Sequence, residues 1–285
     1  MTPAARISAV MEILSLMDAS RVPMDTLLGD YMRSRRYIGS KDRAAIAEMS
    51  YAVIRAYARL NWWCEGLAIE NSPRARVLIW LILGQDMAEK HIKSRFDGSK
   101  YGPVPLSPDE AAIISRLDGQ TLHHADMPAH VRLECPQAYE DSLRARFGEN
   151  FEAEMKALLH PAPLDIRVNI LKASRDTIQA MLAKDGMDSD PTPYSPWGLR
   201  LREKAYLSKS KAFQKGLISI QDEGAQLIAH ACQPHPGMQV LDACAGAGGK
   251  TLALSAAMGG KGRIVAMDND TRRLEKARPR LRSAG

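Results

Sequence analysis

The last third of the chain carries the pattern that most constrains its fold. A short apolar run over 238–242 leads into small residues over 243–249, a helix-forming stretch follows over 250–258, and a second apolar run over 263–267 ends at Asp268. A strand, a glycine-rich turn, a helix and a strand that ends in an acid are typical of the opening of a doubly wound parallel sheet. The sequence therefore predicts a nucleoside-binding α/β domain in this region.

The glycines and the acid each indicate a part of the ligand. A ligand that approaches the backbone at the carboxyl end of the first strand would be blocked by side chains, which glycine lacks. The carboxylate of Asp268 suits a ribose, because both ribose hydroxyl groups can donate to it. We therefore predict that the cofactor is bound by Asp268 and by the loop residues Cys244, Ala245, Gly246, Ala247, Gly248, Gly249 and Lys250.

Two other nucleotide motifs fit this loop less well. Gly249-Lys250-Thr251 imitates the end of a phosphate-binding P-loop, but Cys244 stands where that motif needs its first glycine. A dinucleotide site prefers G-x-G-x-x-G, whereas the run that begins at Gly246 reads G-x-G-G-K-T. S-adenosylmethionine is the nucleoside cofactor that remains.

The first hundred residues have the periodicity of helices. Apolar residues recur at steps of three and four over 7–17 and over 46–57, which places each set on one helix face. Ser40 is the candidate N-cap of the second helix, with Asp42 in its first turn. The run 77–83 is apolar on all sides and predicts a buried helix. Together these features predict a small helical bundle.

The pattern changes to mixed α and β after the prolines at 128 and 136. The run 164–169 alternates apolar with polar residues, as a half-buried strand does. Ser174 is the candidate N-cap of a helix over 175–183. The remaining predicted elements are helices over 138–147 and 151–159 and a short strand near 198–201. The sequence therefore predicts a small α+β unit here.

Two basic clusters could bind phosphates, with a solvated surface as the alternative for both. The first lies beside Tyr31 and Tyr37, which could stack on bases, and consists of Arg33, Arg35 and Arg36. Glu203 is the only acidic residue in the segment of the second cluster. This cluster consists of Arg200, Arg202, Lys204, Lys209, Lys211 and Lys215. The net charge of +6 and the pI near 9.1 permit an RNA partner.

The composition excludes several classes of protein. Hydrophobic residues make up 45% of the chain and charged residues 25%, which is typical of folded globular domains. The four cysteines have no C-x-x-C spacing, so we expect neither a metal site nor a disulfide framework. No stretch has the ~18 consecutive apolar residues of a membrane span, and the first ten residues do not form a signal peptide. We expect a cytoplasmic monomer.

A family resemblance follows from these motifs. The run from Leu241 to Thr251, L-D-A-C-A-G-A-G-G-K-T, resembles the cofactor motif D-x-C-A-A-P-G-G-K-T of the RsmB/Sun family, the bacterial methyltransferases of cytosine carbon 5 in ribosomal RNA. The segment 213–227 is similar to the family's lead-in, G-x-x-x-V-Q-D-x-A-S-Q. Arg167 and Asn169 look like its R-x-N strand, and the helical start looks like its NusB-like extension. The resemblance implies S-adenosylmethionine as cofactor, ribosomal RNA as partner, and Arg167 and Asn169 as RNA-binding residues.

The sequence departs from the family pattern at two places. Gly246-Ala247 replaces the family's Ala-Pro, which keeps the loop small. The resemblance also implies a nucleophilic cysteine that attacks carbon 6 of the base and a second cysteine that assists release, in Pro-Cys and Thr-Cys motifs downstream of the acid. We find neither motif up to Gly285 and assign no catalytic residue. We expect a truncated, inactive product, with a natural non-catalytic variant as the alternative.

None of the four cysteines can substitute for the missing ones by motif. Cys135 precedes a proline instead of following one, and Cys244 belongs to the cofactor loop. We expect Cys64 and Cys232 to be small buried residues of helices.

The predicted architecture is multidomain. It comprises an all-α NusB-like RNA-binding bundle over 1–125, a small α+β RNA-binding unit over 126–212, and the start of a Rossmann-like α/β methyltransferase domain over 213–285. The implied activity is S-adenosylmethionine-dependent methylation of cytosine carbon 5 in ribosomal RNA. The alternative is a non-catalytic RNA-binding protein that uses the NusB-like bundle.

Overall fold

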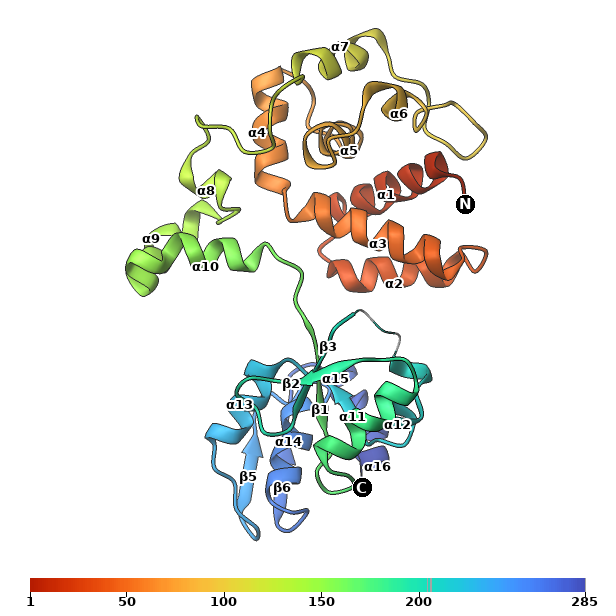
Figure 1. Ribbon diagram of the computed structural model, residues 1–285. Coiled ribbons are helices and arrows are strands. Elements are labelled where there is room, and N and C mark those ends of the chain that lie inside the picture. The colour runs from red at the N-terminus through yellow and green to blue at the C-terminus, as the bar shows by residue number, and fades with distance from the viewer. Residues whose placement is uncertain (204, 206, 285) are drawn as a thin grey trace. The chain divides into compact units, whose positions relative to one another are not determined.

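The computed structural model describes residues 1–203, 205 and 207–284 (Figure 1). The chain forms two compact units, the first ending at His160 and the second beginning at Pro161. The first is built from helices and the second from two small sheets with helices, so the prediction of a multidomain chain is confirmed. Across the described residues, no helix is long and apolar enough to span a membrane.

The first unit is helical, as predicted. A π-helical turn, Trp80–Gly84, extends its most buried helix, α5, and a 3₁₀ turn, Gly148–Asn150, joins its last two helices. The helices are α1 Pro3–Asp18, α2 Met24–Ser34, α3 Ser40–Ile54, α4 Tyr57–Leu67, α5 Pro73–Ile79, α6 Glu89–Lys93, α7 Pro108–Arg116, α8 Ala129–Arg132, α9 Gln137–Phe147 and α10 Phe151–Leu158.

The apolar stripes predicted from the sequence form the core of this unit. Ile7 and Val10 of α1 and Ile46 and Val53 of α3 are almost fully buried and belong to one hydrophobic cluster. The apolar run 77–83 lies in the same cluster, which confirms the prediction of a buried helix. The helical unit is therefore held together mainly by burial of these side chains.

The predicted N-cap of α3 is wrong. Gly39 occupies the N-cap position with an extended backbone, and Ser40 is the first helical residue. Asp42 lies in the first turn as expected, but its carboxylate accepts a hydrogen bond from Arg6 Nε at 2.7 Å. The acid thus ties α3 to α1.

The small sheet of the second unit is antiparallel, with strand order β2-β3-β1-β4. Ile166 and Val168 of β1 are buried in a cluster with Ile178 and Leu182 of α11, and Ser174 caps that helix as predicted. The elements are β1 Leu164–Val168, α11 Arg175–Lys184, β2 Ser189–Pro191, β3 Gly198–Leu201, a 3₁₀ turn at Leu207–Lys209, α12 Lys211–Gln214 and β4 Ile218–Ile220. The predicted boundary at residue 212 is untested, and β4 lies beyond it.

The second sheet is formed by the two apolar runs before and after the glycine-rich loop and its helix. Its two strands are parallel, with Val240 opposite Ile264 in register. Val240 and Ile264 pack against the cluster of α13 and α14, whereas Leu241 and Val265 on the other face are 60% and 40% exposed. The elements are α13 Glu223–Ala231, β5 Gln239–Asp242, α14 Gly249–Ala257, β6 Arg263–Ala266, α15 Thr271–Glu275 and α16 Ala277–Ala284.

Candidate functional site

The glycine-rich loop lies at the carboxyl end of β5, as predicted. Gly246 and Gly248 have φ values of +52° and +77°, in the left-handed region that favours glycine. The amide of Ala245 donates to the Met267 carbonyl at 2.8 Å, and the amide of Gly246 donates to Asp268 Oδ2 at 2.7 Å. The loop is thus held against the end of β6.

Asp268 lies next to this loop at the end of β6. Its two oxygens accept from the amides of Gly246 and of Asp270, the latter at 2.8 Å. Hydrogen bonds from the amides of Asp270 and Gly246 hold the pKa of the Asp268 carboxyl below its usual range. Asp270, not Asp268, is the N-cap of α15, so Asp268 is not needed to cap this helix. An ionised carboxylate oxygen keeps a free lone pair after accepting one bond.

The start of α14 presents donors toward the same end of the sheet. The first amides of a helix have no intrahelical acceptor, and in α14 these belong to Gly249 and its two successors. Asp242 Oδ2 accepts from the Thr251 hydroxyl at 2.6 Å, which joins the end of β5 to the first turn of α14. Cys244 and Lys250 are exposed. The loop therefore combines unpaired backbone donors with an ionised acid.

The structure gives Gly248 a further reason to be glycine. A Cβ atom at this position would lie 3.0 Å from the Cβ of Ala277 in α16. At Gly246, a Cβ would lie 2.9 Å from the guanidinium of Arg273. We predicted these glycines only from the room that a ligand needs. The structure shows that they also allow α15 and α16 to pack against the loop.

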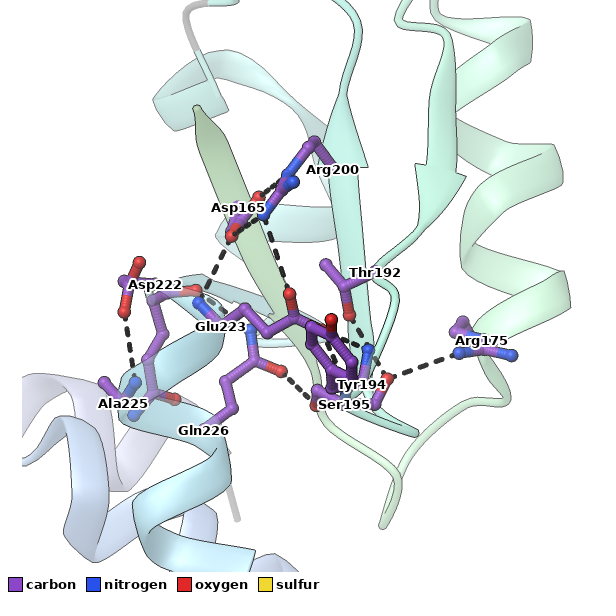
Figure 2. A network of polar contacts seen from close by, with 11 residues as sticks. Asp165, Arg175, Thr192, Tyr194, Ser195, Arg200, Asp222, Glu223, Ala225 and Gln226 are labelled. Carbon is purple, nitrogen blue, oxygen red and sulfur yellow. Dashed lines mark hydrogen bonds and ion pairs between the residues drawn. The ribbon is translucent and has the colours of Figure 1, made fainter. Parts of the chain in front are cut away.

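The lead-in segment forms a joint between the small sheet and α13 (Figure 2). Asp222 is the N-cap of α13 and accepts from the Ala225 amide. Glu223 Oε1 accepts from the amides of Tyr194 and Ser195 at 2.6 and 2.8 Å. Gln226 Oε1 accepts from the Ser195 hydroxyl at 2.7 Å. These residues of the lead-in form hydrogen bonds within the chain, a role that the sequence did not predict.

Part of the second basic cluster is neutralised by this joint. Arg200 donates to both oxygens of Asp165, at 2.7 and 3.0 Å, as Figure 2 shows. Arg202 forms a similar two-bond pair with Asp190. The segment is therefore less basic than its own composition indicates, because both acids come from other strands. Lys204 lies outside the described residues.

Arg167 and Asn169 are buried, at 2% and 5% exposure. Arg167 Nε donates to Gln221 Oε1 at 2.8 Å. Asn169 Nδ2 donates to the carbonyls of Gly216 and Ala284 at 3.1 and 2.9 Å. Their predicted contact with RNA stays a prediction, and both side chains also join the small sheet to neighbouring segments.

The first basic cluster is partly paired. Arg35 lies over the Tyr31 ring at 3.7 Å and also pairs with Glu12 at 3.2 Å, and Arg33 pairs with Asp30. Tyr31 is 4% exposed, so it offers no free face for stacking, whereas Tyr37 is 74% exposed.

The cysteines differ in exposure. Cys64 and Cys135 are buried, and burial raises the pKa of the Cys64 thiol to about 11 and also raises that of Cys135. Cys232 is exposed, so its predicted burial is wrong: it follows the last residue of α13 and lies at the C-cap. Cys244 is exposed in the loop, as its place after β5 implies.

Comparison with known families agrees with this geometry. A model of the ferredoxin-like domain of RsmF/B-like methyltransferases matches residues 135–207, and a model of the 16S rRNA methyltransferase RsmB/F matches residues 229–284. The chain is similar to the RsmB/F family over these two segments. The predicted family is thereby confirmed, and the second match includes the whole loop and Asp268.

Several relatives of this chain bear the name ribosomal RNA small subunit methyltransferase B. The protein of Pseudomonas putida is 37% identical over 53% of the chain and 35% of the relative. That of Photorhabdus laumondii is 25% identical over 86% of the chain and 60% of the relative. The chain thus spans less than two thirds of the length of these relatives.

Solved structures share the fold of this chain. The crystal structure of a protein designated PH0851 covers 100% of this chain and 68% of its own, with TM-score 0.74 and 19% identity. A methyltransferase homolog protein from Pyrococcus horikoshii covers 63% of this chain and 54% of its own, with TM-score 0.51 and 31% identity.

Proposed function

We propose that the chain carries the cofactor-binding and RNA-binding parts of an S-adenosylmethionine-dependent methyltransferase that acts at carbon 5 of cytosine in ribosomal RNA. In this proposal residues 1–125 form a NusB-like RNA-binding bundle, the region 126–212 is a small RNA-binding unit, and 213–285 begins a Rossmann-like domain. The main support is the loop between β5 and α14 with Asp268 beside it, in a segment that matches the RsmB/F family.

The loop fits the chemistry of this cofactor. The first-turn amides of α14 can donate to the methionine carboxylate, and the residues from Ala243 to Gly249 have small side chains or none. Asp268 can accept from the ribose hydroxyls with its remaining lone pairs. The bound cofactor would supply an electrophilic methyl group, and the residues of the chain would hold and orient it.

The RNA would be held mainly through phosphates. Arg36, Lys209, Lys211 and Lys215 are exposed, and exposed cations supply salt-dependent affinity for the RNA backbone. Tyr37 offers an exposed ring near the first cluster. RNA affinity that falls with rising salt is therefore expected of the whole chain.

A glycine pair tests the cofactor site. Gly248 and Gly259 both have left-handed backbones, with φ of +77° and +64°, but a Cβ would meet Ala277 only at Gly248. Gly248→Ala should abolish detectable binding of S-adenosylmethionine in calorimetry, and Gly259→Ala should retain it. Equal affinity of the two variants, with folded circular dichroism spectra, would contradict the assignment of the loop.

One observation favours a second candidate, a non-catalytic RNA-binding protein. Among the four cysteines, two are buried with raised pKa values, and Cys244 is part of the proposed cofactor loop. Attack on a pyrimidine ring needs a thiolate held beside the base. RNA binding without any cofactor binding would support this second candidate.

A further inference from the structure

A cavity of about 280 Å³ lies among β1, α12, β4 and the second half of α16. Its polar lining includes Arg167, Asn169, Ser219 and Arg280. None of the described residues that line it is an aspartate or a glutamate. Among the described residues, the cavity therefore contains two cationic side chains and no anionic one.

Arg167 is a buried cation with an unused donor. Its Nε donates to Gln221 Oε1 at 2.8 Å, and its Nη2 donates to the Ser219 hydroxyl at 3.3 Å. Its Nη1 is buried and has no hydrogen-bond partner within the described part of the chain. Burial and the nearby charge of Arg280 lower the pKa of Arg167 to about 10, so the guanidinium is still protonated at neutral pH.

Arg280 brings a second guanidinium from α16. Its Nη1 donates to the carbonyl of Ala247 at 2.8 Å, and burial lowers its pKa. No ion pair joins Arg280 or Arg167 to a described carboxylate. Two like charges thus share one cavity, and the charge of Arg280 helps to lower the pKa of Arg167.

The same strand shows how such a charge is ordinarily balanced. Asp165 stands two residues before Arg167, on the same face of β1, and pairs with Arg200 through two hydrogen bonds (Figure 2). A buried charge without a partner is strongly destabilising. Within the part of the chain that the structure describes, Arg167 has no carboxylate partner such as Arg200 has, so an added anion would complete its environment.

We infer that this cavity is an oxyanion site that binds a phosphate group between Arg167 and Arg280. Guanidinium groups match phosphate with paired N–H donors. The amide of Asn169 is already used by two carbonyls, so the two arginines supply the binding. The assignment of this phosphate to RNA rests on the proposed function, whereas the site itself rests on the side chains.

The size of the cavity is suited to a phosphate with part of its nucleoside. Pockets for drug-sized ligands begin at about 300 Å³, close to the volume found here. A phosphodiester of an RNA chain and free inorganic phosphate share the chemistry required. They differ in that only the RNA would extend out of the cavity.

Two arginines of α16 give a matched pair of variants. Arg280 is half-buried and lines the cavity, whereas Arg278 is exposed and does not line it. Arg280→Gln and Arg278→Gln remove the same charge from the same helix. Binding of inorganic phosphate is measured by calorimetry on the full chain, and binding of a labelled RNA hexanucleotide is measured by fluorescence anisotropy at constant ionic strength.

The site predicts that Arg280→Gln weakens phosphate binding about tenfold, as expected for a lost hydrogen bond to a charged group, while Arg278→Gln resembles the wild type. Equal phosphate affinity in the two variants, or no phosphate binding by the wild type, would overturn the inference. If Arg280→Gln also weakens hexanucleotide binding more than Arg278→Gln does, the phosphate belongs to RNA. If it weakens only phosphate binding, the site takes the free ion.

A separate titration tests the proposed function independently of the phosphate site. S-adenosylmethionine binding is titrated on the wild-type chain without phosphate or RNA. If the wild-type chain does not bind S-adenosylmethionine, the cofactor assignment is wrong. The phosphate titrations still decide whether the oxyanion site exists. The variant Arg167→Lys, which keeps the charge and removes the paired donors, should weaken phosphate binding if it folds, and Arg280→Gln decides the matter if it does not.

Discussion

Replacing Glu223 with alanine should loosen the joint between the small sheet and α13. The side chain is 7% exposed, and one oxygen accepts from the amides of Tyr194 and Ser195. The other oxygen lies 3.6 Å from a guanidinium nitrogen of Arg200. Alanine would leave both amides without this acceptor.

The magnitude follows from the exposure of the two donors. A buried donor left without a partner costs about 1–3 kcal/mol. Ser195 is 2% exposed and should lose the larger part, whereas Tyr194 is 77% exposed and its amide can reach water. The free energy of unfolding of the second unit should therefore fall by about 1–3 kcal/mol.

Hydrogen exchange measured by mass spectrometry tests this at the joint itself. Amides over 194–197 should exchange faster in Glu223→Ala, and the urea midpoint of the second unit should fall. Glu275→Ala, which removes an exposed acid of α15, should change the free energy of unfolding by no more than ~0.5 kcal/mol. Unchanged exchange over 194–197 in Glu223→Ala would refute the role given to this side chain.

The same residue predicts a pH dependence. Burial raises the pKa of Glu223, but hydrogen bonds from the amides of Ser195 and Tyr194 outweigh it, so the pKa lies below its usual range. A carboxyl with a lower pKa in the folded state contributes stability above its unfolded pKa, and this is lost as pH falls through the folded pKa. The stability difference between wild type and Glu223→Gln should therefore shrink as pH falls below about 4.

Three further outcomes are expected. Asp268→Asn should weaken S-adenosylmethionine binding about tenfold in calorimetry, because an amide has one acceptor oxygen where the carboxylate has two; equal affinity would contradict the ribose assignment. The polypeptide of residues 1–285 should incorporate no labelled methyl group into undermethylated ribosomal RNA, and any turnover, whether lost or kept in Cys244→Ser, would show chemistry not identified here. Leu241→Lys and Val265→Lys should reduce self-association in sedimentation, since both lie exposed on the uncovered face of the β5–β6 sheet; unchanged sedimentation would exclude this face as the cause.

The local elements were predictable because their signals are local. The strand, loop, helix and strand over 238–267 follow from apolar runs and glycines, and the helices of the first unit follow from their periodicity. Ser174 was found as an N-cap because a capping hydroxyl acts on amides within three residues. The prediction of Ser40 as an N-cap was wrong because Gly39 has the extended backbone that the cap position requires.

The pairing of side chains across the fold could not be predicted from one sequence. Asp165 and Arg200 are 35 residues apart, and nothing in either segment shows that β1 and β3 are neighbours. The two arginines of the cavity are still further apart in the chain. The exposed position of Cys232 depends on where α13 ends, and helix ends are the least certain part of a sequence-based assignment.

The segment 218–231 limits how the chain can be exchanged with its relatives. It first forms β4, which pairs with β1 of the small sheet, and then continues through Gln221 into α13 beside the cofactor part. A chimera cut near residue 212 would supply β1 from one parent and β4 from the other. The two parents would then have to match in the register of β4 against β1. They would also have to match in the contact of Gln221 with Arg167 and in the contacts of Glu223. Crossovers placed after α13 keep all of these within one parent.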